Sequence, residues 1–202
     1  MLLDLLQSRS QQRTIALCQT QDTRTTQPGQ PTHQLFQQSR PASGEAGRKA
    51  NCWLIEGIAM YMESLRRRDN CFVLGGRDDV RVEAARRHLE KNDFYVPFDK
   101  LSRMGVRDVQ THPHIAMLYS QIAAMTSFLV HYQNGRYRDA LVSCLRAIYD
   151  GSQDPDLLAR TTGVDYAEMD KQYRAYMASG DKLAERKSEI TSPKSQINSN
   201  NQ

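Results

Sequence analysis

A single carboxylate lies inside an apolar stretch of the chain, and the fold must accommodate it. Residues 53–63 read WLIEGIAMYME, with Glu56 near the middle of the run. The apolar residues favour a buried helix, whereas a buried carboxylate needs a hydrogen bond, a cation or a metal to offset its desolvation. Because charged side chains are seldom fully buried, the alternative is that the Glu56 side of this helix reaches water.

The same segment resembles a known metal-binding helix. The pattern Trp-Leu-x-Glu-Gly-x-Ala-x-Tyr-x-Glu over residues 53–63 is similar to the second metal-binding helix of gluzincin-type zinc metallopeptidases, especially the DUF1570, or peptidase-MA-like, proteins of planctomycete bacteria. The resemblance extends over about residues 32–177. It implies that Glu56 is the third zinc ligand, and that the other two ligands come from a His-Glu-x-x-His motif on an earlier helix.

The stretch where that motif belongs departs from it. His33 stands at the place of the second His, but Gly29 replaces the first His and Gln30 replaces the catalytic Glu. A carboxamide is no base toward a zinc-bound water, and Pro31 opposes a helix there. Catalytic zinc usually has three protein ligands, so His33 and Glu56 alone would hold it weakly. His33 is therefore either a surviving zinc ligand or an ordinary surface His.

Composition divides the chain into three parts. Residues 1–31 are rich in Gln, Thr and Arg, and we expect them to be disordered. Only the short apolar patch 14–18 could form a strand, and the segment is too polar to build the sheet that the resemblance implies before the motif. Residues 32–179 are expected to form one domain, and 180–202 a disordered tail. Such a start would arise from a truncated or frame-shifted gene reading, or from decay into a pseudoenzyme. The predicted fold is mainly α, a helical C-terminal subdomain of a zincin-like metallopeptidase with little or no sheet.

Periodicity and terminal residues place the elements along the chain. Asn51 is a candidate cap for the Glu56 helix, which we expect to end in the basic run 66–68. Asp165 and Glu168 form a capping-box pattern before the last helix, and Gly151 suits a helix C-terminus. The remaining predictions are a strand at 71–74, a charged helix at 78–91, an extended segment at 95–98, a helical turn at 99–104, and helices at 115–132, 136–150 and about 154–163.

Three further sets of side chains are candidates for a site. The resemblance suggests Tyr119 as an oxyanion-stabilising catalytic residue; the alternative is a tyrosine whose hydroxyl caps the core. Glu63 lies two turns after Glu56 and is either a supporting carboxylate or a solvated residue. His112 and His114 flank a proline, which suits a metal-binding pair or simply a helix N-terminus.

Charge and cysteine content limit the classes of partner. The net charge is +4, and the basic runs 66–68 and 86–88 have no interleaved aromatic residues, so we expect solvated helix faces and no nucleic-acid binding. The four cysteines form no Cys-x-x-Cys motif and are widely spaced. Cys52 and Cys144 fit small core positions, whereas Cys71 falls on a candidate strand that could approach Cys52. The apolar stretch 115–132 is interrupted by polar residues, which favours a buried helix over a membrane span.

These observations lead to a DUF1570-like, metallopeptidase-related protein without peptidase activity, with zinc as the cofactor of an incomplete site. The rival hypothesis is a non-enzymatic helical module that binds a peptide or protein partner, and a third is an unstable fragment. The first residues do not form a secretory signal, although the resemblance implies that many relatives are exported. Compartment, substrate and oligomeric state stay open.

Overall fold

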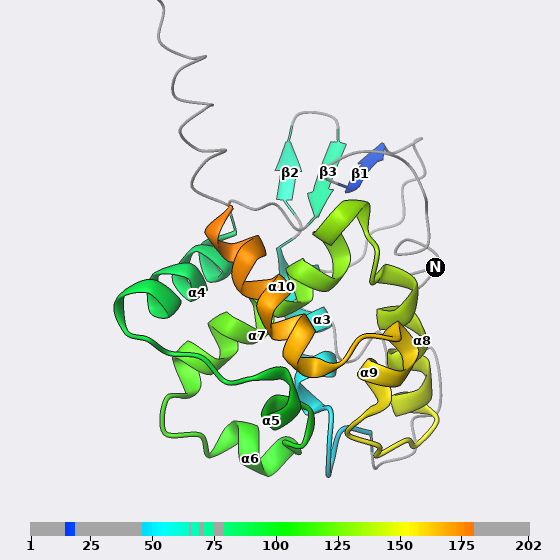
Figure 1. The fold of residues 1–202 in the computed structure, drawn as a ribbon. Helices are drawn as coiled ribbons and strands as arrows, with labels where there is room; N and C mark the ends of the chain where they lie inside the picture. The colour runs from blue at the N-terminus through cyan, green and yellow to red at the C-terminus, as the bar shows by residue number, and fades with distance from the viewer. Residues whose placement is uncertain (1–14, 19–45, 65, 69–70, 75–78, 180–202) are drawn as a thin grey trace, which may run out of the picture.

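The computed structural model describes residues 15–18, 46–64, 66–68, 71–74 and 79–179 of the chain. This part is mainly helical, which confirms the predicted class, and a small sheet lies at one end of the helices (Figure 1). The elements in chain order are β1 (Ile15–Cys18), α3 (Cys52–Glu63), β2 (Arg66–Arg68), β3 (Cys71–Leu74), α4 (Val80–Lys91), α5 (Phe98–Ser102), α6 (Val106–Gln110), α7 (Ile115–His131), the 3-10 turn η1 (Tyr132–Asn134), α8 (Arg138–Tyr149), α9 (Leu157–Thr162) and α10 (Tyr166–Ala178).

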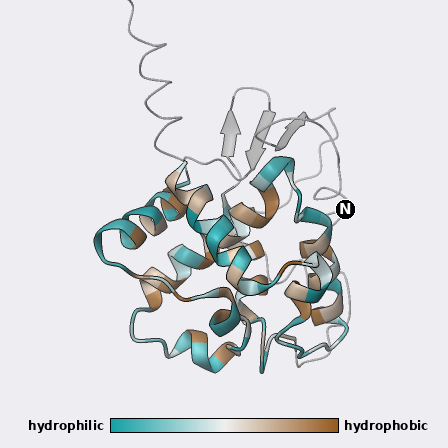
Figure 2. Ribbon diagram, in the orientation of Figure 1, coloured by the Kyte–Doolittle hydropathy of each residue, from teal (hydrophilic) through white to brown (hydrophobic). Residues whose placement is uncertain are grey.

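Helix α7 is the centre of the helical body. It packs along α3 and α4 and also contacts α6, α8 and α10 (Figure 1). All residues from 121 to 130 are buried, as expected for a helix that is covered on several sides. Hydrophilic residues predominate on the outward side of α4, whereas hydrophobic ones lie toward the middle of the body (Figure 2). Among the described helices, none combines the length and the apolarity that crossing a bilayer requires.

Gly57 allows α3 and α7 to approach closely. A Cβ atom at this position would overlap Thr126 Oγ1 and lie 3.2 Å from Ile122 Cγ2. Both α7 residues are fully buried, and Thr126 Oγ1 donates a hydrogen bond to the Ile122 carbonyl oxygen at 3.0 Å. The glycine that follows Glu56 therefore sets the separation between the two helices.

The Asp170 carboxylate on α10 binds the extended segment that precedes α5. Asp170 Oδ1 accepts hydrogen bonds from the Tyr95 hydroxyl at 2.5 Å and from the Phe98 backbone N–H at 2.9 Å. Gln121 of α7 adds two more bonds, to the N–H and the carbonyl oxygen of Val96. These bonds satisfy backbone groups that an extended segment cannot pair internally, and they hold Phe98 in the aromatic core.

The three strands form an antiparallel sheet in the order β1-β3-β2. Strands predicted at 14–18 and 71–74 are confirmed at Ile15–Cys18 and Cys71–Leu74. The prediction for the basic run is wrong. Helix α3 ends at Glu63 with Ser64 as its C-cap, and Arg66–Arg68 forms β2 instead of the last helical turn.

Helix boundaries elsewhere follow the sequence signals closely. Asp165 Oδ1 accepts from the Glu168 N–H at 2.8 Å and begins α10, as the capping pattern predicts. Gly151 follows α8 with φ 102°, a conformation that favours glycine. Asn51 differs from its prediction: its backbone is left-handed, with φ 57°, and its side chain does not cap α3 but donates from Nδ2 to the Asp154 carbonyl oxygen.

Arg86 is the clearest departure from the expected solvated face. Its side chain lies on α4, yet the residue is only 8% exposed. Nε donates to the Met177 carbonyl oxygen at 3.1 Å, and the guanidinium pairs with Glu83 of the preceding turn. The arginine thereby satisfies a carbonyl in the last turn of α10, where a positive charge also interacts favourably with the helix dipole.

Candidate functional site

The fold brings together two of the residues singled out from the sequence. Glu56 lies in the middle of α3, and Tyr119 lies in the second turn of α7. The Tyr119 hydroxyl lies close to the Glu56 carboxylate, whose charge contributes, after burial, to raising the pKa of Tyr119. Both residues are half-buried, so the carboxylate is neither enclosed in the core nor fully surrounded by water. The close packing at Gly57 produces this contact, because it holds α3 against α7.

The charge of Glu56 acts on neighbours from three helices. Burial, and then the Glu56 charge, raise the pKa of Tyr119 on α7. The same two causes raise the pKa of Tyr149, at the end of α8, to about 12. One turn before Glu56, Cys52 is 3% exposed, and burial followed by the charges of Glu56 and Asp108 raises the pKa of its thiol to about 12.

These shifts define what the cluster can do chemically. At neutral pH the Cys52 thiol and both tyrosine hydroxyls hold their protons, because their pKa values lie above the ordinary ones. The thiol is therefore a poor nucleophile. The hydroxyl of Tyr119 is a hydrogen-bond donor, the property that an oxyanion-stabilising group requires. Glu56 is an oxygen ligand or a hydrogen-bond acceptor.

The described residues contain only part of the implied zinc ligand set. No group of three or more His, Cys, Asp or Glu side chains in the described ranges is arranged to hold a metal. Glu56 is the one member of the implied ligand set that falls within those ranges, and its carboxylate already interacts with Tyr119. His33, Gly29 and Gln30 lie outside the described residues.

Glu63 is separate from the Glu56 cluster. It is exposed at the end of α3, and its Oε2 lies 3.0 Å from Arg81 Nη1 of α4. Both side chains are about half exposed, at 51% and 46%, so the pair contributes little to stability. The solvated alternative for Glu63 is the one that agrees with this geometry.

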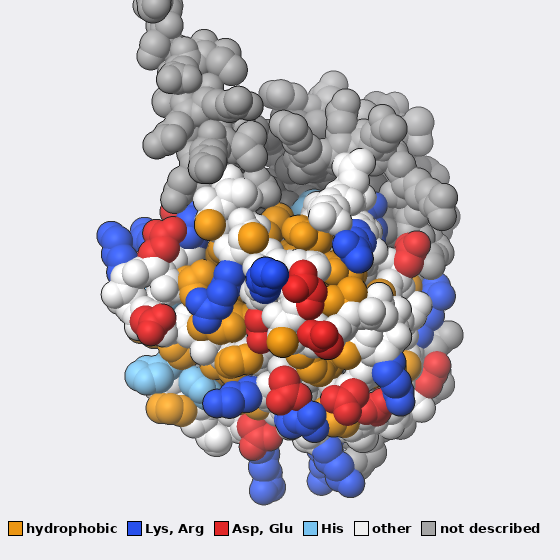
Figure 3. Space-filling model, viewed as in Figure 1, with side chains coloured by type: hydrophobic (Ala, Val, Ile, Leu, Met, Phe, Trp, Pro, Cys, Tyr) orange, Lys and Arg blue, Asp and Glu red, His pale blue; other side chains and the backbone are white. Residues whose placement is uncertain are grey.

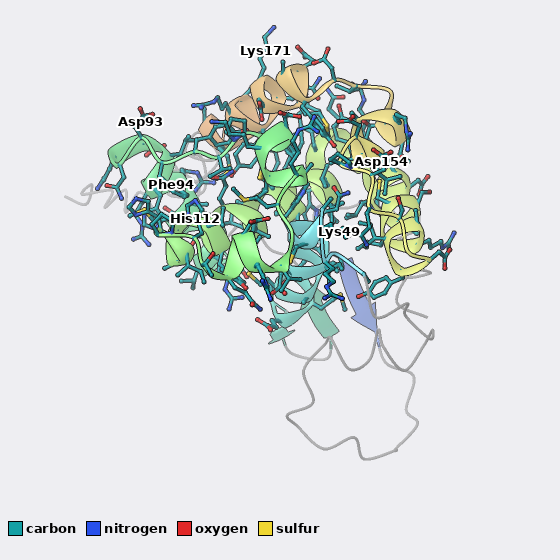
Figure 4. All side chains as sticks on the ribbon, turned by 90° about the horizontal axis from the view of Figure 1, so that it is seen from below. Lys49, Asp93, Phe94, His112, Asp154 and Lys171 are labelled. Atoms are coloured by element: carbon teal, nitrogen blue, oxygen red, sulfur yellow. The ribbon has the colours of Figure 1, made fainter. Side chains whose placement is uncertain are left out.

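His112 and His114 lie beside an aromatic ring rather than a set of ligands. The Phe94 ring makes edge-on contacts with both imidazoles, at centroid distances of 6.2 Å to His112 and 5.9 Å to His114. Figure 4 shows Phe94 beside His112. His112 Nδ1 accepts a hydrogen bond from the His114 backbone N–H at 3.2 Å. This bond occupies one ring nitrogen and closes the turn before α7, in agreement with the helix N-terminus interpretation.

Sequence reasoning did not identify two members of the Glu56 cluster. Cys52 precedes Glu56 by four residues, so helix periodicity alone could have placed it on the same side. Tyr149 comes from another helix, and no local signal links it to Glu56.

On the face shown in Figure 3, acidic and basic side chains are interspersed over the helices, without a continuous stripe of one sign.

Comparison with known proteins gives no assignment: no family model matches the chain, and neither a curated protein nor a solved structure is significantly similar to it.

Proposed function

We propose that this protein is a relative of the gluzincin-type, DUF1570-like metallopeptidases that does not hydrolyse peptides. The contact between Glu56 and Tyr119 is the observation that supports the proposal. The resemblance implies zinc binding by Glu56 and oxyanion stabilisation by Tyr119, although the two residues are far apart in sequence. A chance resemblance of one helix would not require the second residue to lie beside the first.

The lack of hydrolysis follows from the residues at the motif positions. Gln30 stands where the general base belongs, and Gly29 has no side chain to bind a metal. With His33 and Glu56 as the remaining ligands, zinc would bind weakly. In the present chain, Glu56 on α3 and Tyr119 on α7 lie close enough for the carboxylate charge to raise the pKa of Tyr119.

Restoring the missing motif tests this proposal directly. The triple substitution Gly29→His, Gln30→Glu and Pro31→Ala rebuilds the ligand, the base and the helical backbone upstream of His33. Zinc is measured by atomic spectroscopy after incubation with excess zinc and dialysis. The rebuilt chain should retain near-stoichiometric zinc, and the additional substitution Glu56→Gln should abolish that gain.

The unsubstituted chain and its Glu56→Gln variant serve as the matched pair. Both should retain little zinc after dialysis, and neither should cleave a fluorogenic peptide library with zinc present. The rival hypothesis, a helical module that binds a peptide or protein, predicts no zinc gain in the rebuilt chain. That result would refute the proposed relationship, and zinc-dependent cleavage by the unsubstituted chain would refute the proposed lack of activity.

A further inference from the structure

An imidazole closes the turn that precedes α7. His112 Nδ1 accepts a hydrogen bond from the His114 backbone N–H at 3.2 Å, and His114 is the N-cap residue of the helix. The His114 side chain makes no capping bond of its own. Its carbonyl oxygen accepts the first bond of the helix, from the Leu118 N–H at 3.0 Å. The turn and the first helical turn are therefore linked through one residue.

The hydrogen bond in this turn requires an uncharged ring. A backbone N–H can only donate, so Nδ1 of His112 must present its lone pair, whereas both ring nitrogens of an imidazolium carry a proton. Protonation of His112 therefore removes the acceptor, and the His114 N–H at the helix N-terminus loses this partner. A histidine side chain normally takes up this proton at about pH 6.5.

The surroundings of the two imidazoles also disfavour positive charge. The ring centroids of His112 and His114 are 6.2 Å apart, so two imidazolium rings would repel each other. Both rings lie at the N-terminus of α7, the positive end of the helix dipole, and the first turn of α7 contains no acidic residue. Phe94 packs against both rings and supplies no counter-charge.

Other ionisable side chains come from the elements on either side of the turn. Those near the end of α4 and in the segment after it are His88, Glu90, Lys91 and Asp93, and those on α6 are Arg107 and Asp108. Asp108 Oδ2 accepts from the Gly105 N–H at the far end of α6, and His88 Nδ1 accepts from Asn92 Nδ2. Within the described part of the chain, none of them forms an ion pair or a hydrogen bond with His112 or His114.

We propose that the turn at residues 111–114 is a pH-sensitive switch, which opens together with the first turn of α7 when His112 and His114 are protonated. Because His112 Nδ1 binds a proton only after its hydrogen bond breaks, a fall in pH favours the open form. Leu118 is fully buried, so the opening should be confined to the first helical turn, directly before Tyr119. This inference uses the contacts of the turn alone and does not depend on the proposed relationship to metallopeptidases.

Amide hydrogen exchange of the full chain tests the proposal, at about pH 7.5 and about pH 5.5, on either side of the usual histidine titration. The quantity compared is the protection factor, which corrects each amide for the pH dependence of exchange in an unstructured peptide. The His114 and Leu118 amides should lose protection by about threefold to tenfold at the lower pH, as expected for loss of one hydrogen bond and an unfavourable charge at a helix end. The buried amides of residues 121–130 should keep theirs.

His112→Asn is the matched variant, because an asparagine side chain accepts from the backbone N–H two residues later and does not titrate. It should remove most of the loss of protection, and His112→Asn/His114→Gln should remove all of it. His88→Gln, on α4, should behave as the unsubstituted chain. The proposal is wrong if protection at His114 and Leu118 is unchanged at the lower pH, if either variant at position 112 loses as much as the unsubstituted chain, or if residues 121–130 lose protection equally.

Discussion

The substitution Gly57→Ala should destabilise the protein even though alanine is the better helix former. In an exposed helix, replacing glycine by alanine stabilises by about 1 kcal/mol. At Gly57 the new Cβ would overlap Thr126 Oγ1, and that atom is held by its hydrogen bond to the Ile122 carbonyl oxygen. Relief requires either loss of that bond or separation of α3 from α7.

The expected magnitude combines these opposing effects. Overpacking a close-packed core costs typically about 1–3 kcal/mol, and the fully buried Thr126 and Ile122 leave little room for adjustment. After the gain in helix propensity is subtracted, Gly57→Ala should lower the free energy of unfolding by up to about 2 kcal/mol. Combining it with Thr126→Ala, which removes the overlapping atom, should give a favourable coupling of about 1 kcal/mol.

Urea unfolding followed by circular dichroism measures each variant. Ala175→Gly, at an exposed position of α10, is the control that measures the difference in helix propensity alone. If Gly57→Ala stabilises the protein by as much as Ala175→Gly destabilises it, the close approach of α3 to α7 is wrong. A coupling near zero with Thr126→Ala would contradict the assigned cause.

Three further predictions concern ionisable groups. Glu56→Gln should lower the pKa of Tyr119, because the carboxylate charge contributes to raising it. A pH titration of tyrosinate absorbance measures the shift, and the same substitution in a Tyr119→Phe background is the control. An unchanged pKa would exclude the proximity of Glu56 to Tyr119. Asp170→Ala should lower the free energy of unfolding by about 2 kcal/mol, since it leaves a buried backbone N–H unpaired, whereas Lys171→Ala, whose side chain is 80% exposed, should have almost no effect. Burial raises the pKa of the Cys144 thiol from 9.0 to about 11. The folded state therefore holds this proton more tightly, and stability should fall between about pH 9 and pH 11, less steeply in Cys144→Ala.

The helices were predictable where the pattern was local. Helix α8 has an unbroken apolar stripe, and α10 begins at an aspartate whose side chain caps it as predicted. Both signals depend on residues within a few turns of each other. The prediction for the basic run after α3 is wrong because cations favour a helix C-terminus but are equally compatible with a short strand, here Arg66–Arg68.

The site was predictable only in part, because its members come from separate helices. Periodicity placed Glu56 on a helix, but the proximity of Tyr119 was suggested by a family resemblance and not by local pattern. The burial of Arg86 had no local signal, since its acceptor is the Met177 carbonyl oxygen on a distant helix. Hydrogen bonds from a side chain to a backbone group that is remote in sequence have no local pattern, so they are the hardest contacts to predict from a single sequence.

The order of the strands also affects how copies of this protein would associate. The sheet has two edges, β1 and β2. Strand β2 consists of three consecutive arginines, and charged residues on an edge strand oppose its pairing with another chain. Strand β1, with the sequence IALC, carries no charge. Edge-to-edge aggregation would therefore proceed through β1, and a lysine introduced at one of its positions would be the simplest protection against it.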